Sequence, residues 1–407
     1  MIPEKLQHIL LELRLSKWIG SLLFNSKNVY IVGGSVRDGF LNKQIKDIYL
    51  IVEGLSLNDI KNYLSTFGKV DIVGESFSVI KFRPFGYEGE PFDIAIPRMD
   101  RKKGQGHKGF EIITEGVDIV TDLKRRDFTV NSIAINVKTN ELVDPFNGLS
   151  DLSHFILRAT DETAFIEDPL RILRGIQFSA RFGFHIESKT MNLMIENSHL
   201  IKEISGERIF EEFQKIILKN GNTDLAFRLI NRTGLDKSLF GHEMDVQEFG
   251  KLDEISFFYI LGILGGIDPV YFVKNRLKGN SLLEKNVKVL SDIMKIPIII
   301  KEDEFRFLIL KAIEKAPLVI NSVILPKRVD DLILKMQKGE IPISTKLIQV
   351  NGDDVMSEFP ELKDQQIGLL IRQIVKDALM NNFDWKNRKK SLEFLNTLKI
   401  IYISQKL

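Results

Sequence analysis

The chain contains no cysteine among its 407 residues. This absence excludes disulfides, thiolate metal sites and cysteine nucleophiles together. The six histidines are scattered without paired spacing, which argues against a zinc site. No window holds the roughly 18 apolar residues that a membrane-spanning helix needs, so no membrane partner is expected. The N-terminus lacks the basic start, apolar middle and cleavage site of a signal peptide, so we expect a cytoplasmic protein.

Neither positive nor negative charge is in large excess, since 57 lysines and arginines face 55 aspartates and glutamates. The net charge is +2 and the isoelectric point is near 8.4, which does not by itself indicate a nucleic-acid-binding protein. Basic clusters lie at 101–103, 124–126 and 386–390. Each is either a solvated face or a set of phosphate contacts. The sequence contains no internal repeat and no low-complexity tract.

Hydrophobic patterning predicts an α+β protein. Short apolar runs predict four strands near the N-terminus, with one helix between the second and the third. These runs are 29–34, 47–52, 77–82 and 92–96, with the helix near 57–68. We expect a mixed or mostly antiparallel sheet, whose strand order the pattern does not fix. From about residue 160 the periodicity is helical, with Pro169 in a first turn and Gly183, Gly221 and Gly234 as stops.

The segment GGSVRD at 33–38 follows the first predicted strand. Two adjacent glycines let the backbone approach a ligand closely, and their amides can face phosphate oxygens. Arg37 adds a planar fork for a phosphate or a carboxylate. The alternative is an ordinary strand-to-helix turn. No third glycine follows at the spacing of a dinucleotide fingerprint.

Two aspartates lie in predicted strands. On the strand at 47–52, Asp47 and Tyr49 are expected to share one face, opposite the apolar residues. Asp93 lies in FDIAIPR, and a carboxylate amid apolar residues needs a partner, a metal or a proton. Asp47 and Asp93 therefore predict one Mg²⁺ site. The alternative is that each is a strand-edge or capping residue.

Further along, KRRDFTVNSIAIN at 124–136 gathers basic residues beside an aspartate. Arg125, Arg126 and Asp127 are candidates for contacts with a nucleoside triphosphate and its sugar, or else form an ion-paired helix start. The turn-rich segment DPFNGLSDL at 144–152, with Asp144 and Asp151, is interpreted as structural.

The segment EDPLRILR at 167–174 opens a predicted helix with Asp168 as its N-cap. A carboxylate with an arginine three residues later can also present an acceptor and donors to the edge of a base. Helical spacing places four side chains on one face: Arg171, Arg174, Phe178 and Arg181.

Taken together, the order and spacing of these motifs resemble class II tRNA nucleotidyltransferases and bacterial poly(A) polymerases. The segments that carry the resemblance are GGSVRD, DIYLIVEG, FDIAIPR, RRDFTVNSIAIN, DPFNGLSDL, EDPLRILRGIQFSARFGF and GERIFEEF. They cover roughly residues 28–215, and NGDDVM at 351–356 is a weaker match to a tail signature.

The resemblance implies a nucleotidyltransferase head with a mixed sheet and helices, followed by an all-helical neck, body and tail. The expected boundaries are 1–155 for the head, 156–220 for the neck that recognises the base, 221–335 for the body and 336–407 for the tail that contacts tRNA. The expected partners are CTP, ATP and the acceptor end of tRNA. The oligomeric state is left open.

The resemblance also implies roles for individual residues. Four would hold the incoming triphosphate, five would help to bind the nucleotide, and two would read the base edge. The first group is Gly33, Gly34, Arg37 and Asp38, and the second is Arg125, Arg126, Asp127, Asn131 and Arg174. The base edge would be read by Asp168 and Arg171. The segment 98–110 would move during the switch from C to A addition.

The implied reaction is attack of the RNA 3′-hydroxyl on the α-phosphate, assisted by two Mg²⁺ ions on carboxylates. The catalytic and metal-binding residues would be Asp47 and Asp93. Where the family has Asp-x-Asp, this chain has Asp47-Ile48-Tyr49. A phenol with an ordinary pKa of about 10 is neutral at pH 7 and replaces a carboxylate poorly. We predict that the site is degraded to one metal and that turnover falls roughly 10²-fold or more, a loss of about 3 kcal/mol.

Several alternatives stay open at this point. One is a poly(A) polymerase of the same family, and others are enzymes that add only CC or only A. A different class is a non-catalytic tRNA-binding paralogue, which Tyr49 favours. A metal-dependent phosphohydrolase is disfavoured because the helical half lacks a His-Asp pair. The sequence does not decide whether Glu53 replaces the missing carboxylate.

Overall fold

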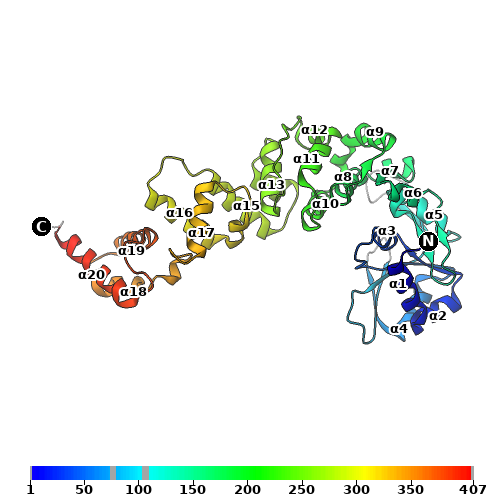
Figure 1. Ribbon diagram of the computed structural model, residues 1–407, viewed down its shortest axis with the longest axis horizontal. Coiled ribbons are helices and arrows are strands. Elements are labelled where there is room, and N and C mark those ends of the chain that lie inside the picture. The colour runs from blue at the N-terminus through cyan, green and yellow to red at the C-terminus, as the bar shows by residue number, and fades with distance from the viewer. Residues whose placement is uncertain (1, 74–78, 103–109, 405–407) are drawn as a thin grey trace. The chain divides into compact units, whose positions relative to one another are not determined.

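The computed structural model describes residues 2–73, 79–102 and 110–404. The chain divides into two compact units, Met1–Val246 and Gln247–Leu407. In Figure 1 the strands of the main sheet lie in the blue to cyan N-terminal part, and helices make up the green to red remainder. The α+β class expected from the sequence is therefore confirmed. The finer boundaries of head, neck, body and tail stay predictions.

The first unit is built around a seven-stranded mixed sheet. β2 and β5 run parallel, whereas the other neighbouring strands run antiparallel. Across the sheet the order is β3 (Gly68–Val73), β4 (Val79–Pro84), β5 (Phe92–Ala95), β2 (Tyr49–Glu53), β1 (Asn28–Val32), β8 (Ala134–Asn136) and β9 (Leu142–Val143). The four predicted strands are thus β1, β2, β4 and β5, while β3, β8 and β9 were not predicted.

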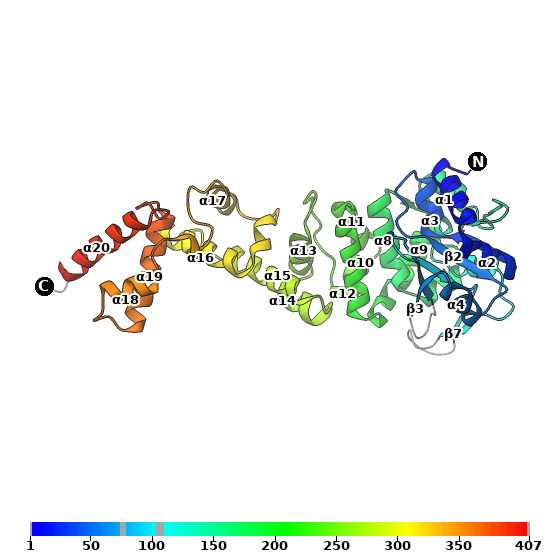
Figure 2. The same cartoon turned by 90° about the horizontal axis from the view of Figure 1, so that it is seen from below.

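One face of the sheet is fully covered by helices. Alternation along β1 sends Val29 and Ile31 into a large buried cluster on this face. Trp18 belongs to the same cluster and packs against Phe82 and Phe92, with ring centroids 5.0 and 4.8 Å apart. The covering helices, visible in Figure 2, are α1 (Glu4–Leu15), α2 (Lys17–Asn25) and the predicted α4 (Leu57–Ser65).

The opposite face is covered only in part. Tyr30 and Val32 of β1 and Ile51 of β2 form a smaller buried cluster with Ile119 and Leu123. The last two residues belong to the short helix α5 (Ile119–Lys124). Because α5 is only six residues long, it leaves the start of β2 uncovered. That uncovered area holds the candidate site.

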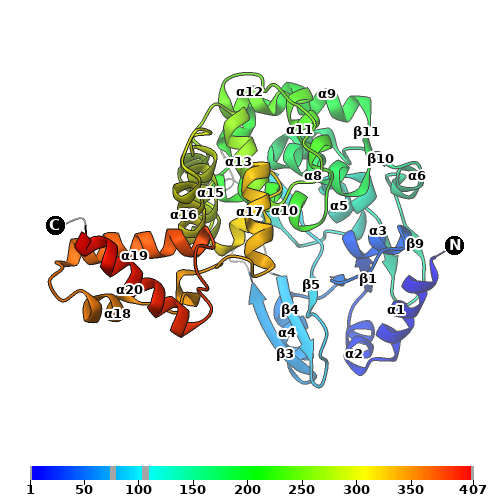
Figure 3. The same ribbon diagram turned by 60° about the vertical axis from the view of Figure 1, so that its left-hand side comes forward.

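The later part of the first unit is mainly helical, as expected, and is organised around α8 (Leu170–Phe182). It also contains a two-stranded parallel sheet of β10 (Ile156–Leu157) and β11 (His185–Ile186). α10 and α11 pack against α8, as Figure 3 shows. The residue before the helix is Pro169 rather than the predicted N-cap Asp168, and Gly183 ends it at a φ of 74°. The other helices are α3 (Gly34–Phe40), α6 (Gly148–Ser153), α7 (Glu162–Glu167), α9 (Ser188–Asn197), α10 (Gly206–Leu218), α11 (Thr223–Arg232) and α12 (Leu235–Phe240).

Within residues 247–404, the part of the second unit that the structure describes, the regular elements are all helices, joined by loops. Its helices are α13 (Glu254–Leu264), α14 (Pro269–Tyr271), α15 (Ser281–Met294), α16 (Glu302–Lys315), α17 (Lys327–Gln337), α18 (Gly352–Glu358), α19 (Asp364–Leu379) and α20 (Arg388–Ser404). Across the described residues, no single helix has the length and apolar character to cross a membrane. Glu254–Leu264 and Pro269–Arg276 meet that test only as a pair bent by 112°.

Candidate active site

The glycine turn after β1 lies directly against an arginine of the predicted site. Gly33 has a φ of 65°, and α3 begins at the next residue. A Cβ at Gly33 would lie 2.6 Å from Nη1 of Arg126, which is closer than carbon and nitrogen can pack. A side chain at Gly33 would therefore strain the backbone and force the Arg126 guanidinium to shift. The turn brings two of the predicted nucleotide-binding residues into contact.

Ser35, which sequence reasoning missed, joins this turn to the start of β2. Its Oγ donates to the carbonyl oxygen of Asp47 at 2.9 Å and accepts from the N–H of Tyr49 at 3.0 Å. The expectation that Asp47 lies within a strand is wrong, because β2 begins at Tyr49. Asp47 is held at the strand entrance by its backbone, and its side chain is exposed.

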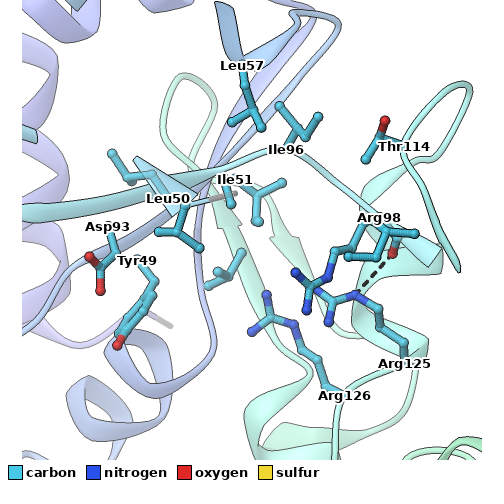
Figure 4. Close-up of a pocket in the computed structure, with 14 residues that line it drawn as sticks. Tyr49, Leu50, Ile51, Leu57, Asp93, Ile96, Arg98, Thr114, Arg125 and Arg126 are labelled. Atoms are coloured by element: carbon cyan, nitrogen blue, oxygen red, sulfur yellow. Dashed lines mark hydrogen bonds between the residues drawn. The ribbon is translucent and has the colours of Figure 1, made fainter. Parts of the chain in front are cut away.

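Tyr49 and Asp93 are direct neighbours, as Figure 4 shows. They are paired across the parallel strands β2 and β5. On the other side of Asp93, Lys81 of β4 is its registered partner, and the Lys81 Nζ lies 2.9 Å from Asp93 Oδ1. Partial burial of the phenol, followed by the negative charges of Asp93 and Asp47, raises the pKa of Tyr49 to about 12. The hydroxyl therefore keeps its proton at neutral pH.

This set of side chains does not fit a two-metal site. Within the described residues, no group of three or more histidine, cysteine, aspartate or glutamate side chains is placed to hold a metal ion. Glu53 does not complete one, because its oxygens accept from the Ile119 N–H at 2.6 Å and from Asn28 Nδ2 at 2.9 Å. Four residues along β2 also place Glu53 about 13 Å from Tyr49.

A cavity of about 340 Å³ opens between this centre and a group of arginines. Tyr49 and Asp93 line one side, and Arg98, Arg125 and Arg126 line the other (Figure 4). Burial, and then the neighbouring Arg125, lowers the pKa of Arg98 to about 10, so this group still carries its charge at pH 7. Three guanidinium groups on one wall make the cavity suited to an anion such as a polyphosphate.

Two of these arginines are fixed by Asp122, a residue that sequence reasoning also missed. Its side chain is fully buried and accepts from Arg125 Nη2 at 2.6 Å and from Arg126 Nη2 at 2.9 Å. Burial alone would raise the pKa of Asp122, but the two arginine charges outweigh it and the pKa lies below its usual value. The expected helix start is wrong, because Arg125 and Arg126 follow the end of α5.

A second network joins the glycine turn to α8. Arg37 donates to Asp38 Oδ1 from Nε at 2.9 Å and to Asn131 Oδ1 from Nη1 at 2.6 Å. Asn131 Nδ2 donates to Asp127 Oδ1 at 2.9 Å, and Arg174 Nε donates to Asp127 Oδ2 at 2.9 Å. Burial would raise the pKa of Asp127, but Arg174, Asn131 and further donors lower it to about 2.

The predicted face of α8 also contacts this network. The Arg37 guanidinium lies over the rings of Phe178 and Phe182, 5.1 and 4.6 Å from their centroids. Arg174 lies 5.3 Å from the Phe178 centroid. This places Arg37 and Arg174 on the same aromatic surface, and the prediction that Arg174 and Phe178 share a face is confirmed.

The residues expected to read the base edge lie at the start of this face. Arg171 donates through its guanidinium to the backbone carbonyls of Arg125 and Arg126. Asp168 Oδ1 accepts from the Leu170 N–H at 3.3 Å, and its Oδ2 lies 3.6 Å from Arg208 Nη2. Base readout by Asp168 and Arg171 stays a prediction.

Two other expectations concern supporting segments. Asp144 accepts from the backbone N–H groups of Gly148 and Leu149, and Asp151 accepts from Thr129 Oγ1 at 2.7 Å. Both therefore have structural partners, as predicted, and Asp151 joins two segments 22 residues apart. In the expected mobile segment 98–110, β6 (Met99–Lys102) pairs with β7 (Phe110–Ile113), and residues 103–109 lie outside the described residues.

Comparison with known proteins identifies the part of the chain that holds the cavity. Residues 29–158 match the family described as "Poly A polymerase head domain". After the head domain, residues 183–246 match "Probable RNA and SrmB- binding site of polymerase A". The resemblance expected from the sequence is thus confirmed.

Curated relatives of the head domain and the helices after it carry CCA names. The "Multifunctional CCA protein" of Aliivibrio salmonicida is 38% identical over 193 residues, which cover 46% of this chain and 44% of that protein. The "CCA-adding enzyme" of Blochmanniella floridana is 35% identical over 221 residues, covering 53% and 50%. The chain spans about half the length of the curated relatives it matches.

Solved structures show the same fold over more of the chain. The Bacillus stearothermophilus CCA-adding enzyme in complex with CTP has a TM-score of 0.70 at 19% identity, covering 95% of this chain and 97% of that one. The Thermotoga maritima CCA-adding enzyme complexed with tRNA has a TM-score of 0.68 at 22% identity, covering 96% and 98%. At these identities the likeness concerns the fold, in which the head domain is the part with a sheet.

Proposed function

We propose that this chain is a tRNA 3′-end nucleotidyltransferase that adds C and A residues, completing a CCA end from CTP and ATP without a nucleic-acid template. The observation that carries the proposal is the match to the head-domain family, together with a cavity lined by Arg125 and Arg126 of the predicted nucleotide-binding set and by the predicted catalytic Asp93. Relatives that are 35 to 38% identical carry CCA names. The cytoplasm, where tRNA and nucleoside triphosphates meet, is the proposed place of action.

In the proposed reaction, the 3′-hydroxyl of the RNA attacks the α-phosphate and pyrophosphate leaves. The triphosphate would lie against the glycine turn and the arginine wall of the cavity, where Arg98, Arg125 and Arg126 offer three positive charges. Fixed cations stabilise the charge on the leaving pyrophosphate without reorganising during the reaction. The base would then face the start of α8, where Asp168, Arg171 and Arg174 offer an acceptor and donors.

Enzymes that transfer phosphoryl and nucleotidyl groups generally use divalent metal ions. The expected Mg²⁺ pair does not fit the residues of this chain, so no step is assigned to it. We propose that turnover is reduced roughly 10²-fold or more relative to a centre with a carboxylate at position 49. Tyr49 offers a protonated hydroxyl there, not a second carboxylate.

Nucleotide incorporation tests the proposal. Full-length protein would be incubated with a tRNA lacking its CCA end, labelled CTP and ATP, and Mg²⁺ or Mn²⁺. We expect slow addition of C, C and A, and faster addition by the Tyr49→Asp variant. If both proteins bind CTP but neither incorporates it, the enzymatic proposal is wrong and the chain is a binding protein.

Two further candidates belong to the same framework. A poly(A) polymerase would extend unstructured RNA with many A residues when ATP is the only nucleotide, whereas the proposed enzyme would stop after one. One observation favours a non-catalytic tRNA-binding protein. Lys81 forms an ion pair with Asp93, and the neighbouring Tyr49 is neutral. Tight tRNA binding without incorporation in Mn²⁺ would identify it.

A further inference from the structure

Three neighbouring strands place three different chemical groups in one row. Tyr49 on β2 is paired with Asp93 on β5, and Asp93 is paired with Lys81 on β4. Side chains at paired positions lie on the same face of a sheet, so they are cross-strand neighbours. The Lys81 Nζ lies 2.9 Å from Asp93 Oδ1. The Asp93 side chain is only 12% exposed, so its carboxylate depends on a partner from the protein.

We propose that the ammonium group of Lys81 is the built-in counter-ion of Asp93 and occupies the position that a divalent cation would otherwise take. An ammonium supplies one positive charge and up to three hydrogen bonds without further ligands. Mg²⁺ instead requires six oxygen ligands in near-octahedral geometry. Among the described residues, no third carboxylate joins Asp47 and Asp93. The lysine therefore neutralises the Asp93 carboxylate at a site that has too few oxygen ligands to hold Mg²⁺.

The arrangement has a consequence for repairing the site. Replacing Tyr49 with aspartate adds a carboxylate on β2 but leaves Lys81 in contact with Asp93 on β5. A divalent ion entering between them would meet a fixed positive charge a few ångströms away. At such a distance the repulsion should weaken binding of the ion by roughly tenfold even in a water-like medium. Tyr49→Asp alone should therefore recover metal binding only in part.

Binding of Mn²⁺ to the full-length protein tests this inference. The ion is followed by the loss of its free six-line electron paramagnetic resonance signal, without RNA or nucleotide. We expect no tight binding by the unmodified chain and weak binding by Tyr49→Asp. The double variant Tyr49→Asp/Lys81→Gln should bind at least about tenfold more tightly than Tyr49→Asp. Tyr49→Asp/Lys81→Thr provides a second double variant with a side chain that strands favour, in case glutamine impairs folding.

Two controls separate the charge of Lys81 from general effects of mutation. Tyr49→Asp/Lys81→Arg keeps the positive charge and should bind Mn²⁺ no better than Tyr49→Asp. Lys237 of α12 pairs with Glu243 outside the sheet, with 2.9 Å between Nζ and Oε2. Tyr49→Asp/Lys237→Gln therefore removes a lysine from an ion pair that does not involve Asp93, and should also leave the affinity unchanged.

Either of two results would overturn the inference. One is tight Mn²⁺ binding by the unmodified chain, with a dissociation constant in the micromolar range. The other is equal Mn²⁺ affinity of Tyr49→Asp and of the two double variants that carry Lys81→Gln or Lys81→Thr. This comparison requires that both double variants retain the thermal unfolding transition of the parent. The inference rests on the proposed function, because it concerns the metal site of that enzyme. Its test, however, measures metal binding without any nucleotide transfer. A failure of one claim therefore leaves the other to be judged on its own experiment.

Discussion

Gly33 and Arg126 are in close contact at the end of β1. The backbone of Gly33 has a positive φ, and the Arg126 guanidinium fills the space that a Cβ would need. Gly34, the next residue, is different, because a Cβ there would meet only Arg37 Nη2 at an ordinary 3.6 Å. The two glycines of one motif therefore have unequal roles.

This difference makes Gly33→Ala and Gly34→Ala a matched pair. Gly33→Ala should strain the turn by about 1–3 kcal/mol and displace Arg126 from the cavity. We expect CTP binding to weaken by about tenfold or more, as measured by isothermal titration calorimetry. Gly34→Ala should change the affinity much less. Equal losses in both variants would contradict the role assigned to the Gly33–Arg126 contact.

Asp127 predicts a pH dependence of stability. Its folded pKa of about 2 lies below the ordinary value of about 3.9, so it stabilises the fold above pH 4. That contribution, about 2 kcal/mol, is lost as the pH falls from about 4 to about 2. Asp127→Asn should lower the free energy of unfolding at pH 7, and the difference from the parent should shrink over this range.

Urea unfolding of the first unit, followed by circular dichroism at several pH values, measures this effect. Asp71→Asn is a suitable control, because the Asp71 side chain is 55% exposed and forms an ion pair with the exposed Lys69. Its effect should stay within about 0.5 kcal/mol at every pH. A difference between parent and Asp127→Asn that is constant with pH would argue against the assigned linkage.

Individual residues were predictable where a motif carries them. The order of the motifs identified Gly33, Arg37 and Arg126, and the structure brings them to the same region. Ser35, Asp122 and Lys81 were missed for a physical reason. Ser35 and Lys81 owe their roles to contacts with partners 12 residues away on other elements. Asp122 instead binds arginines three and four residues later, but a lone serine, aspartate or lysine in a sequence looks like a solvated residue. Asp122 in particular looks exposed within IVTDLK, yet two arginines allow its burial.

At the scale of elements, α5 is a short helix whose end positions the arginine wall. Asp118 caps its start by accepting from the Thr121 N–H at 2.9 Å, and Asp122 binds both arginines after its end. A six-residue helix has little stability of its own, so these contacts and the packing of Ile119 and Leu123 hold it in place.

Asp122→Asn and Asp118→Asn compare the two ends of α5. Asp122→Asn leaves two arginines without their shared carboxylate and should destabilise the first unit by about 3 kcal/mol. CTP affinity should fall by about tenfold or more because Arg125 and Arg126 lose their fixed orientation. Asn is itself a good N-cap, so Asp118→Asn should be nearly silent. Thermal unfolding and CTP titration check both variants, and similar behaviour of the two would refute this division of roles.

Elements with a clear apolar period were predictable, and β3 shows why one was not. The hydrophobic runs of β1, β2, β4 and β5 are buried on the covered face of the sheet. β3 instead carries Lys69 and Asp71 and ends in partly exposed apolar residues at the edge of the sheet. Its strand conformation depends on backbone pairing with β4, which no local pattern reveals. Strand order across the sheet was unpredictable for the same reason.

At the scale of the whole molecule, the division into two compact units predicts where the chain is cut. The stretch between α12 and α13 has no regular secondary structure, and Lys251 within it is exposed. Limited trypsin digestion should therefore cleave early at Lys251. Mass spectrometry should find two complementary fragments of about 250 and 156 residues, as estimated from the cleavage position. Early cleavage within α8 or α10 would contradict the boundary.

The same division also separates the only two tryptophans of the chain. Trp18 is buried against Phe82 and Phe92 in the first unit, and Trp385 is buried in the second, each 6% exposed. Each unit thus contains its own intrinsic fluorophore. Replacing Trp385 with phenylalanine leaves an emission signal from the sheet-containing unit alone, and replacing Trp18 leaves one from the helical unit alone. The protein can therefore report the unfolding of each half separately, without any attached dye.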